Sequence, residues 1–548
     1  MSVGADRVRA ALVRIAAELG APDVEFALER PREDAHGDLA TNLALQLARP
    51  LRRKPRAIAD AIVAALDLPA DVVTRVEIAG PGFINFFLAE TAVTAVLDPI
   101  LAAGAAYGRA DVGHGTRVNI EFVSANPTGP LHVGNGRGAA LGDAIASLLE
   151  ATGHAVTREF YVNDAGVQIG KLARSLWARL QQAAGREAAV PDGGYHGAYL
   201  EEMATALLAE HPGLADRREE EILPRLESLA MERMRAEQDR DLADFGVRFD
   251  VYASERAIYD SGKIEATLEV LEERELVFEE DGALWLATSR FGDDKDRVIR
   301  KRDGTYTYFL PDLAYHRDKA ERGFARAIDV WGADHHGYVA RMRAALLGLG
   351  LGEAFFDAVI VQLVKVTRGG EEVRFSKRAG DIITLRELFE ETGVDAARYF
   401  FLQRKGDSQF VFDVDLAKRQ TDENPVYYVQ YAHTRMAGIF RTADMVPQTI
   451  VAGWADPSPL TDPSEQELMK RLADYPGIVR KAAEALEPHR VIAYLEDLAR
   501  LVNVWYHRCR VVGEAPAVQN ARLLLARAAQ VVLANGLGLM GVSAPERM

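Results

Sequence analysis

The sequence predicts a multidomain α/β protein: a parallel-sheet domain with insertions, preceded by an α+β domain and followed by an all-α helical bundle. Three observations predict this fold class. The 548 residues are enough for three or four domains of roughly 150 residues each. A strand, a glycine-rich loop, a helix and a second strand succeed one another over 118–162, as in a βαβ unit. From about residue 384 onward, the pattern is almost all helical.

Composition and charge indicate a folded, cytoplasmic protein. Hydrophobic residues make up 48% of the chain, and we find no uninterrupted apolar run of about 18 residues that would span a membrane. The N-terminal segment lacks the apolar stretch of a secretory signal. Cys509 is the single cysteine, which excludes a disulfide within the chain and a cysteine-based zinc site, and we expect no metal site. The formal net charge of −16 disfavours non-specific binding to nucleic acid but still allows a specific RNA contact through a local basic face.

The first domain is expected to cover residues 1–110. Its predicted elements, in order, are helices over 5–19 and 40–66 and strands over 72–78 and 83–88. The basic run of Arg52, Arg53 and Lys54 lies at the end of a helical segment. Such a run is either a solvated surface or a contact to RNA phosphates, and the residues alone leave both interpretations open.

The sheet domain is expected over 111–383, with helical insertions at about 171–245 and 260–300. After the βαβ unit, strand patterns return at 283–287, 306–309, 327–331 and 358–363. The helical bundle then covers 384–548. Pro425 is expected to begin one of its helices, and the proline-rich stretch 447–464 is expected to be a loop between two others.

A glycine-rich loop over 125–138 is the first candidate for chemistry. It joins a strand to a helix, and the backbone N–H groups at a helix N-terminus favour anions such as phosphate. The imidazole of His132 could donate a hydrogen bond to a phosphate oxygen. Pro130, Gly134 and Asn135 lie beside it in this loop. Taken alone, the pattern could equally belong to an ordinary surface loop.

A basic loop supplies the second candidate. Arg374, Lys377 and Arg378 place three cations within five residues, with Ser376 among them and Gly380 following. A mobile loop of this kind can close on a triphosphate and stabilise its transition state. In isolation, it could also be a solvated turn.

Together the two loops resemble the HIGH-like and KMSKS-like signatures of the class I aminoacyl-tRNA synthetases, which implies a Rossmann-like catalytic domain. The first reads His-Val-Gly-Asn from His132, so Asn135 stands in place of the second histidine; it can donate a hydrogen bond but carries no charge. In the second, Arg374 replaces the first lysine and Lys377 matches the second. The resemblance implies catalysis by His132, Asn135, Arg374 and Lys377. It implies that ATP, with Mg²⁺, contacts Pro130, His132, Gly134, Asn135, Ser376 and Lys377.

Longer stretches resemble the arginyl-tRNA synthetase family in particular, in every domain and in the same order. They are 36–42, 78–87, 121–130, 161–168, 332–338 and 423–435. The resemblance implies a monomer that uses L-arginine, ATP and an arginine-accepting tRNA. It also implies attack by the terminal 2′-hydroxyl of the tRNA, and a need for bound tRNA before arginine is activated.

The substrate itself sets a chemical requirement, because a guanidinium is always charged and presents a planar fork of donors that carboxylates match. The resemblance implies an arginine site formed by Glu121, Asn126, Tyr308 and Asp312, with His335 as a weaker candidate. Three alternatives stay open at this point. Tyr308 could be a core residue rather than a ligand. Glu121 could instead pair with a structural arginine, and Asp312 could cap the helix that follows Pro311.

The resemblance implies that the first domain and the bundle bind the tRNA, and we expect contacts from Arg52, Arg53 and Lys54 in the first and from Tyr431 and Arg435 in the second. The stripe of Tyr427, Tyr428 and Tyr431 could instead be mostly helix core, with one exposed face to stack a base. Two rival functions remain: a class I synthetase for another amino acid, and a tRNA-binding relative without catalysis. A cysteinyl enzyme is disfavoured because its zinc site needs several cysteines. A small nucleotidyltransferase is disfavoured by the length of the chain and its helical C-terminal part. A non-catalytic relative is disfavoured because the two acids of the arginine site, Glu121 and Asp312, are present together with His132 and Lys377.

Overall fold

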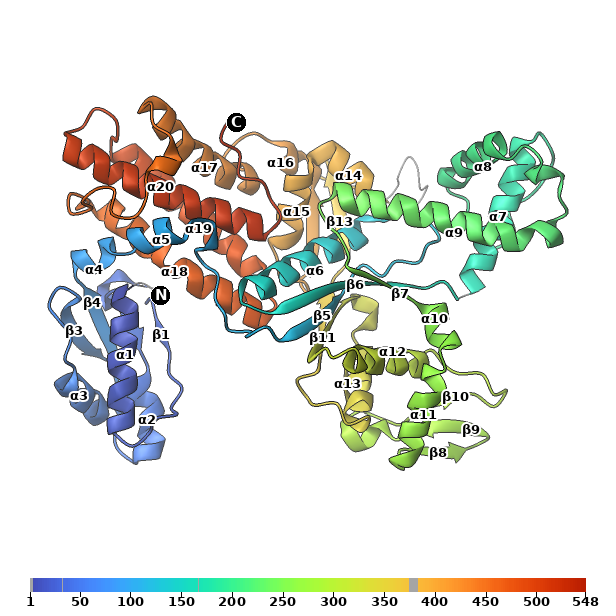
Figure 1. The fold of residues 1–548 in the computed structure, drawn as a ribbon, viewed down its shortest axis with the longest axis horizontal. Helices are drawn as coiled ribbons and strands as arrows, with labels where there is room; N and C mark the ends of the chain where they lie inside the picture. Colours follow the sequence, from blue (N-terminus) through green and yellow to red (C-terminus); the bar gives the residue numbers. More distant parts are fainter. Residues whose placement is uncertain (1–2, 32, 166, 374–382) are drawn as a thin grey trace.

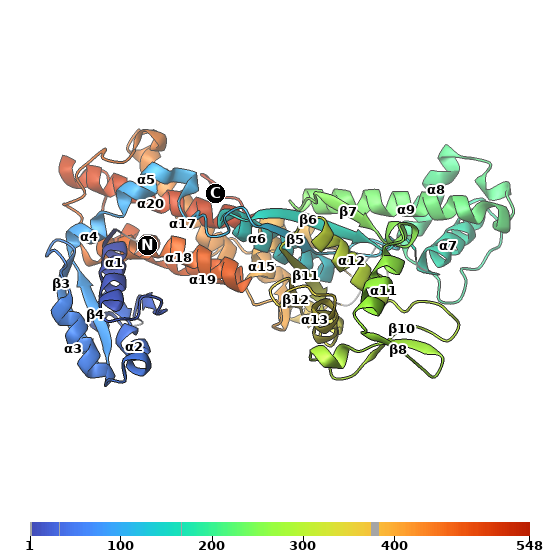
Figure 2. The same cartoon turned by 60° about the horizontal axis from the view of Figure 1, so that its bottom comes forward.

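The computed structural model describes residues 3–31, 33–165, 167–373 and 383–548. The molecule is elongated, with a parallel sheet at its centre (Figure 1). The N-terminal domain and the C-terminal helices lie together at one end, and a helical insertion projects from the other, as a second view also shows (Figure 2). The predicted fold class is confirmed in all three parts.

The N-terminal domain is a four-stranded antiparallel sheet covered by three helices. Its strand order is β1-β2-β4-β3. The elements are α1 (Val3–Glu18), β1 (Leu28–Glu29), β2 (Leu39–Thr41), α2 (Leu43–Leu51), α3 (Pro55–Ala65), β3 (Val73–Ala79) and β4 (Phe83–Leu88). The single helix predicted over 40–66 is wrong. Arg52 is left-handed, with φ of 50°, and Pro55 begins a new helix, so the basic run forms the turn between α2 and α3.

The central sheet has five parallel strands in the order β12-β11-β5-β6-β7. They are β5 (Arg117–Glu121), β6 (Ala155–Val162), β7 (Val251–Ser254), β11 (Arg326–Gly332) and β12 (Phe356–Val361). Helix α6 (Val133–Ala151) packs on one face, and α12 (Phe309–Glu321) and α13 (Tyr338–Gly348) pack on the other (Figure 1). Gly142 lets α6 approach the sheet closely, because a Cβ there would lie 2.3 Å from the Phe122 ring.

Two sequence predictions need correction in this domain. Helix α6 begins at Val133, inside the predicted loop 125–138, because the His132 side chain caps it. The strand predicted over 306–309 is also wrong, because α12 begins at Phe309 and Tyr306 makes only an isolated bridge to Arg300. Pro311 is compatible with the first turn of that helix, where a backbone N–H is not needed.

The two insertions follow β6 and β7. The first consists of α7 (Val167–Ala183), α8 (Ala198–Glu210) and α9 (Glu219–Asp244), which share a small hydrophobic core. The second consists of α10 (Glu255–Asp260), α11 (Lys263–Glu273) and the antiparallel strands β8 (Val277–Glu280), β9 (Ala283–Leu286) and β10 (Arg297–Arg300). The strand predicted at 283–287 therefore exists, but it lies outside the parallel sheet.

The C-terminal region is a helical bundle. Short helices α4 (Glu90–Thr94) and α5 (Leu97–Ala103) lead from the N-terminal domain towards it. Its own helices are α14 (Leu385–Thr392), α15 (Val394–Leu402), α16 (Val414–Lys418), α17 (Pro425–Thr442), α18 (Pro463–Ala485), α19 (His489–Arg508) and α20 (Pro516–Leu539). Helix α20 is long and apolar enough to span a membrane by composition, but 67% of its most apolar window is buried, and it packs against α17 and α19 as a core helix.

One strand interrupts the helical region. Strand β15 (Phe410–Asp413) pairs in parallel with β13 (Val364–Arg368), which also pairs with β14 (Glu371–Glu372). The expectation of almost pure helix after residue 384 missed β15. Its alternation of Phe410 and Phe412, both buried, with an exposed Val411 is a strand pattern too short to stand out among helices.

Candidate active site at the carboxyl edge of the sheet

The predicted site residues gather where the parallel strands end. Glu121 ends β5, Asp164 follows β6, Glu255 follows β7, and His335 follows β11. The carboxyl ends of parallel strands meet at one edge, which is where ligands bind in open α/β sheets. The sequence prediction missed Asp164, which follows the predicted strand at 155–162, and Glu255, because it also missed the short strand β7 that precedes it.

His132 and Asn135 cap helix α6 reciprocally. His132 Nδ1 accepts hydrogen bonds from the backbone N–H groups of Gly134, at 3.1 Å, and Asn135, at 3.2 Å. Asn135 Oδ1 accepts one from the N–H of His132, at 3.1 Å. Because Nδ1 accepts, the proton of the neutral ring is on Nε2, which is then a donor. Desolvation by the surrounding protein lowers the pKa of the His132 imidazole, which favours this neutral form.

The loop before α6 is held by the first insertion. Gln238 Nε2, from α9, donates to the carbonyl oxygens of Asn126, at 3.0 Å, and Gly129, at 2.9 Å. The Tyr199 hydroxyl, from α8, donates to the carbonyl oxygen of Thr128 at 2.7 Å. Asn126 is exposed, and its Nδ2 donates to Gln168 Oε1 at 3.0 Å. The first insertion therefore fixes the backbone of the glycine-rich loop that precedes α6.

Glu121 is almost fully buried, and both of its oxygens are engaged. Oε2 accepts a hydrogen bond from Lys319 Nζ at 2.7 Å, and Oε1 accepts one from Ser124 Oγ at 3.0 Å. Ser124 has a left-handed backbone, with φ of 40°, so this contact holds a strained turn at the end of β5. The sequence left open that Glu121 pairs with a structural arginine. In the structure, Glu121 does form a buried ion pair, but its partner is Lys319.

Asp312 and Glu255 form a desolvated acidic pair at the same edge. Burial raises the pKa of Asp312 to about 6, although the Tyr338 hydroxyl donates to its Oδ2 at 2.7 Å. Burial, and then repulsion from Asp312 and Asp164, raises the pKa of Glu255 to about 7. Glu255 Oε2 is buried and has no hydrogen-bond partner within the described part of the chain. Two neighbouring carboxyl groups that are both desolvated favour the binding of a cation between them.

Tyr308 and His335 lie at the rim of this site. Tyr308 is 76% exposed, one turn before Asp312 on the chain. The His335 side chain is 54% exposed, lies 3.3 Å from Asp334 and contacts the Trp331 ring. Neither residue is a core side chain, so both are accessible to a ligand.

The second loop predicted for ATP, with Arg374, Ser376 and Lys377, lies outside the described residues. The chain that follows it is joined to the first loop. Val133 N–H donates to the carbonyl oxygen of Ile383 at 3.2 Å, and Leu385 N–H donates to that of Leu131 at 2.7 Å. His132 and Thr384 form an isolated β-bridge. Residues 383–385 are thus bonded to the first loop on both sides of His132.

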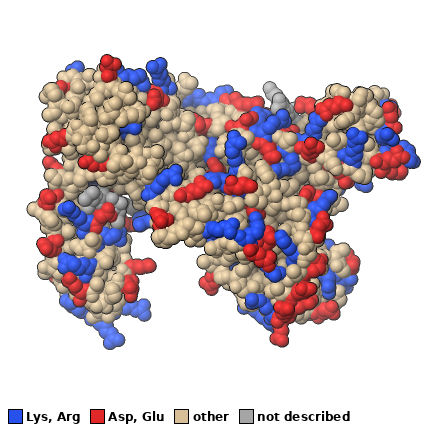
Figure 3. Space-filling model, viewed as in Figure 1, with Lys and Arg blue, Asp and Glu red and all other residues tan. Residues whose placement is uncertain are grey.

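The residues predicted to contact tRNA lie far from this edge. Arg52, Arg53 and Lys54 are exposed, and Lys and Arg side chains project from the free end of the N-terminal domain (Figure 3). In the bundle, Tyr431 stacks on Tyr427 with ring centroids 5.7 Å apart. The Arg435 guanidinium lies 4.6 Å from the centroid of the Tyr431 ring.

Comparison with known proteins identifies the family. Three family models match in sequence order: "Arginyl tRNA synthetase N terminal domain" over 4–88, "tRNA synthetases class I (R), catalytic domain" over 96–436, and "DALR anticodon binding domain" over 429–548. The chain is 50% identical to an arginine–tRNA ligase of Desulforudis audaxviator, covering 99% of this chain and 97% of that protein. It is 48% identical to one from Geobacillus kaustophilus, covering 99% and 98%.

A solved structure agrees with these matches. The arginyl-tRNA synthetase of Thermus thermophilus has a TM-score of 0.78 and 25% identity, and the match covers 99% of each chain. The similarity therefore extends through the N-terminal domain, the parallel sheet and the helical bundle alike. The chain belongs to the arginyl-tRNA synthetase family of class I aminoacyl-tRNA synthetases.

Proposed function

We propose that the carboxyl edge of the parallel sheet activates L-arginine with ATP and that the product is transferred to the terminal adenosine of a bound tRNA. The observation that carries this function is the pair of desolvated carboxylates, Asp312 and Glu255, at the same carboxyl edge of the sheet from which α6 begins. Membership of the family establishes the reaction. The roles of individual residues are what we propose. We expect the protein to act as a monomer in the cytoplasm.

The guanidinium of arginine binds between Asp312 and Glu255. Both carboxylates are desolvated, so a cation with paired donors recovers the electrostatic energy that burial costs them. Lysine would present a single ammonium and leave part of this hydrogen-bonding capacity unmet, which is a strong basis for rejection. Asn126 holds the α-amino or carboxyl end of the substrate, and Tyr308 and His335 cover it from the rim. Glu121 contributes by holding the turn at Ser124.

The triphosphate of ATP binds at the N-terminus of α6. Its phosphate oxygens accept hydrogen bonds from His132 Nε2 and from the side-chain Nδ2 of Asn135, and Pro130 and Gly134 leave the backbone open to the nucleotide. Contacts of Arg374, Ser376 and Lys377 with the phosphates are assigned from the resemblance of their loop to the second class I signature. Mg²⁺ enters with ATP, because it is usually bound through substrate phosphates rather than a protein cage. The arginine carboxylate then attacks the α-phosphate and pyrophosphate leaves, so these residues act by positioning and charge stabilisation.

Arginine-dependent ATP–pyrophosphate exchange on the purified protein tests this function. Exchange is expected with arginine, and only when its tRNA is present; lysine and cysteine are the controls. Exchange with another amino acid would contradict the pocket assignment, and the absence of exchange from a folded protein that binds tRNA would contradict catalysis. The variant Lys377→Ala is expected to reduce the exchange rate and leave tRNA affinity unchanged.

Arginine affinity is expected to rise with pH between about 5 and 8. Asp312 and Glu255 have pKa values of about 6 and about 7, above those of ordinary carboxyl groups, and only their ionised forms attract the guanidinium. Below its pKa, each group should weaken binding by about tenfold per pH unit. Calorimetric titration of arginine at a series of pH values measures this. Affinity that stays constant from pH 5 to 8 would contradict the assignment.

The same pKa shifts affect stability with the opposite sign. Folding raises the pKa of these carboxyl groups. At a pH between the unfolded and the folded pKa, the folded state therefore holds a proton that the unfolded state has released. These groups therefore destabilise the free protein progressively as pH rises from about 4 to 7. Bound arginine offsets this cost, so the increase in melting temperature caused by arginine is expected to be larger at pH 8 than at pH 5.

Charge reversal in the turn between α2 and α3 is expected to weaken tRNA binding. The double variant Arg52→Glu, Arg53→Glu should lower the slope of log affinity against log salt concentration by about one for each phosphate that the turn no longer neutralises. Arg14→Glu, an exposed change on α1 of the same domain, is the control and should leave the slope unchanged. An unaltered slope in the double variant would mean that the turn is only a solvated surface.

A further inference from the structure

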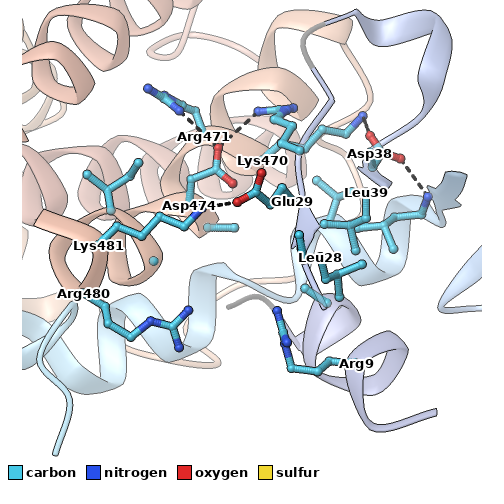
Figure 4. A pocket seen from close by; sticks show the side chains of 18 of the residues that line it. Arg9, Leu28, Glu29, Asp38, Leu39, Lys470, Arg471, Asp474, Arg480 and Lys481 are labelled. Atoms are coloured by element: carbon cyan, nitrogen blue, oxygen red, sulfur yellow. Dashed lines mark hydrogen bonds and ion pairs between the residues drawn. The ribbon is translucent and has the colours of Figure 1, made fainter. Parts of the chain in front are cut away.

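A cavity of about 470 Å³ lies between the N-terminal domain and the helical bundle, away from the site described above. Its walls come from α1, from the strands β1 and β2 and the chain around them, and from α18 (Figure 4). Apolar side chains, including Phe26, Leu28 and Ile478, form part of the lining. Its volume falls within the range of pockets that bind small molecules, roughly 300–1,000 Å³.

The charges that line this cavity are unbalanced. Six of the lining side chains are cationic and three are anionic, in a chain with a formal net charge of −16. Each of the three carboxylates already has a basic partner. Glu29 pairs with Lys481, Asp38 with Lys470, and Asp474 with Arg30 and Arg471.

Arg9 and Arg480 are the two lining cations that pair with none of these three carboxylates. They extend from α1 and α18 into the space between the two domains (Figure 4). Within the described ranges, no carboxylate lies at ion-pair distance from Arg9. Arg480 has only a long ion pair on its own helix, with Nε 3.6 Å from Oε1 of the exposed Glu484, which lies outside the cavity lining. A surface pair of this kind contributes little. The Nε atoms of both arginines are buried without a hydrogen-bond partner.

The two guanidinium groups are close enough to repel one another. Burial lowers the pKa of Arg9, and repulsion from Arg480 lowers it further, against a smaller attraction from Asp6. Facing like charges with unused donors are unfavourable unless an anion lies between them. The guanidinium fork of arginine matches a phosphate group through two parallel hydrogen bonds.

We propose that the cavity between α1 and α18 binds a small organic phosphate, with the phosphate between Arg9 and Arg480 and an apolar ring against Phe26 and Leu28. The Arg9 guanidinium itself stacks over the Phe26 ring, 5.4 Å from its centroid, which orients the fork towards the cavity. Because one arginine belongs to each domain, the bound anion ties the N-terminal domain to the bundle. The site is independent of the proposed active-site roles.

Isothermal titration calorimetry with phenyl phosphate tests the site on the full chain. We expect one binding site in the unaltered protein, and at least tenfold weaker binding in both Arg9→Gln and Arg480→Gln. Arg14→Gln, a matched change on the exposed face of α1, should stay within twofold. His132→Ala should also stay within twofold, which separates this cavity from the nucleotide site. No binding to the unaltered protein, or equally weakened binding in the control variants, would overturn the proposal.

Two further measurements separate ligand binding from a structural role. Without phosphate, Arg9→Gln and Arg480→Gln are expected to melt at or above the temperature of the unaltered protein, because each removes a repulsion. A lower melting temperature in both would show that these arginines hold the fold together and would overturn the proposal. Inorganic phosphate should bind more weakly than phenyl phosphate, and equal affinity would overturn the part of the proposal that assigns an apolar ring.

Discussion

Replacing Asp312 by asparagine is expected to lower kcat/KM for arginine in ATP–pyrophosphate exchange by a factor on the order of 30 to 5,000. Removing the charge from one member of a buried, hydrogen-bonded charge pair costs about 2–5 kcal/mol, and each 1.36 kcal/mol corresponds to about tenfold. Asparagine keeps an oxygen for the hydrogen bond from the Tyr338 hydroxyl, so the local packing should survive. The decrease therefore reports on arginine recognition rather than on folding.

A change on the same helix serves as the control for this prediction. Glu321→Gln alters an exposed carboxylate at the far end of α12, where its partner is Arg317 on the helix surface. It should leave kcat/KM for arginine within about twofold, since surface ion pairs contribute little. Unchanged activity in Asp312→Asn would remove Asp312 from the guanidinium site. The variant Glu255→Gln is expected to show a decrease similar to that of Asp312→Asn.

Replacing Lys319 by alanine is expected to lower the free energy of unfolding by about 3–5 kcal/mol, because it leaves buried carboxylates without their cation. Lys319 Nζ is fully buried and donates to Glu121 Oε2 at 2.7 Å and to Asp329 Oδ1 at 3.0 Å. Burial opposes its charge, but attraction to Asp329 and Glu121 raises the pKa of Lys319 above its ordinary value. Denaturant unfolding followed by circular dichroism measures the change.

Two comparisons sharpen the Lys319 prediction. Lys263→Ala removes a partly exposed ion pair between α11 and Asp318, which lies on α12 beside Lys319. It should lower the free energy of unfolding by less than about 1 kcal/mol. The double variant Lys319→Met, Glu121→Gln should be more stable than Lys319→Ala, because it removes one of the stranded charges together with the lysine. An equal cost for Lys319→Ala and Lys263→Ala would show that the buried network contributes no more than a surface pair.

The sequence predicted the parts of this protein that local signals encode. Glycines and a histidine between a strand and a helix pointed to the start of α6, which we propose as the anion site, because capping and helix polarity depend on neighbours in the chain. Alternating and periodic apolar residues located most of the strands and helices in the correct order. The incorrect predictions also came from local signals. The aromatic run 306–309 has strand propensity, but α12 begins at Phe309. The stretch 40–66 has helical periodicity that continues across the break at Arg52.

Tertiary structure decided which charges meet. Glu121 pairs in register with Asp329 on one side and with Glu159 on the other, so three carboxylates lie in a row across three strands. Lys319 and Arg322, both near the C-terminal end of α12, neutralise that row. No spacing in the sequence reveals this, since strand register and helix placement bring together residues separated by up to about two hundred positions.

The same holds for the proposed arginine site. The sequence supplied Asp312, and only the fold placed Glu255 beside it, where burial raises the pKa of both carboxyl groups. A residue's type and its neighbours along the chain determine the local structure it can form. Its ionisation and its partners depend on desolvation and on charges that distant segments contribute, and those are set only when the chain has packed.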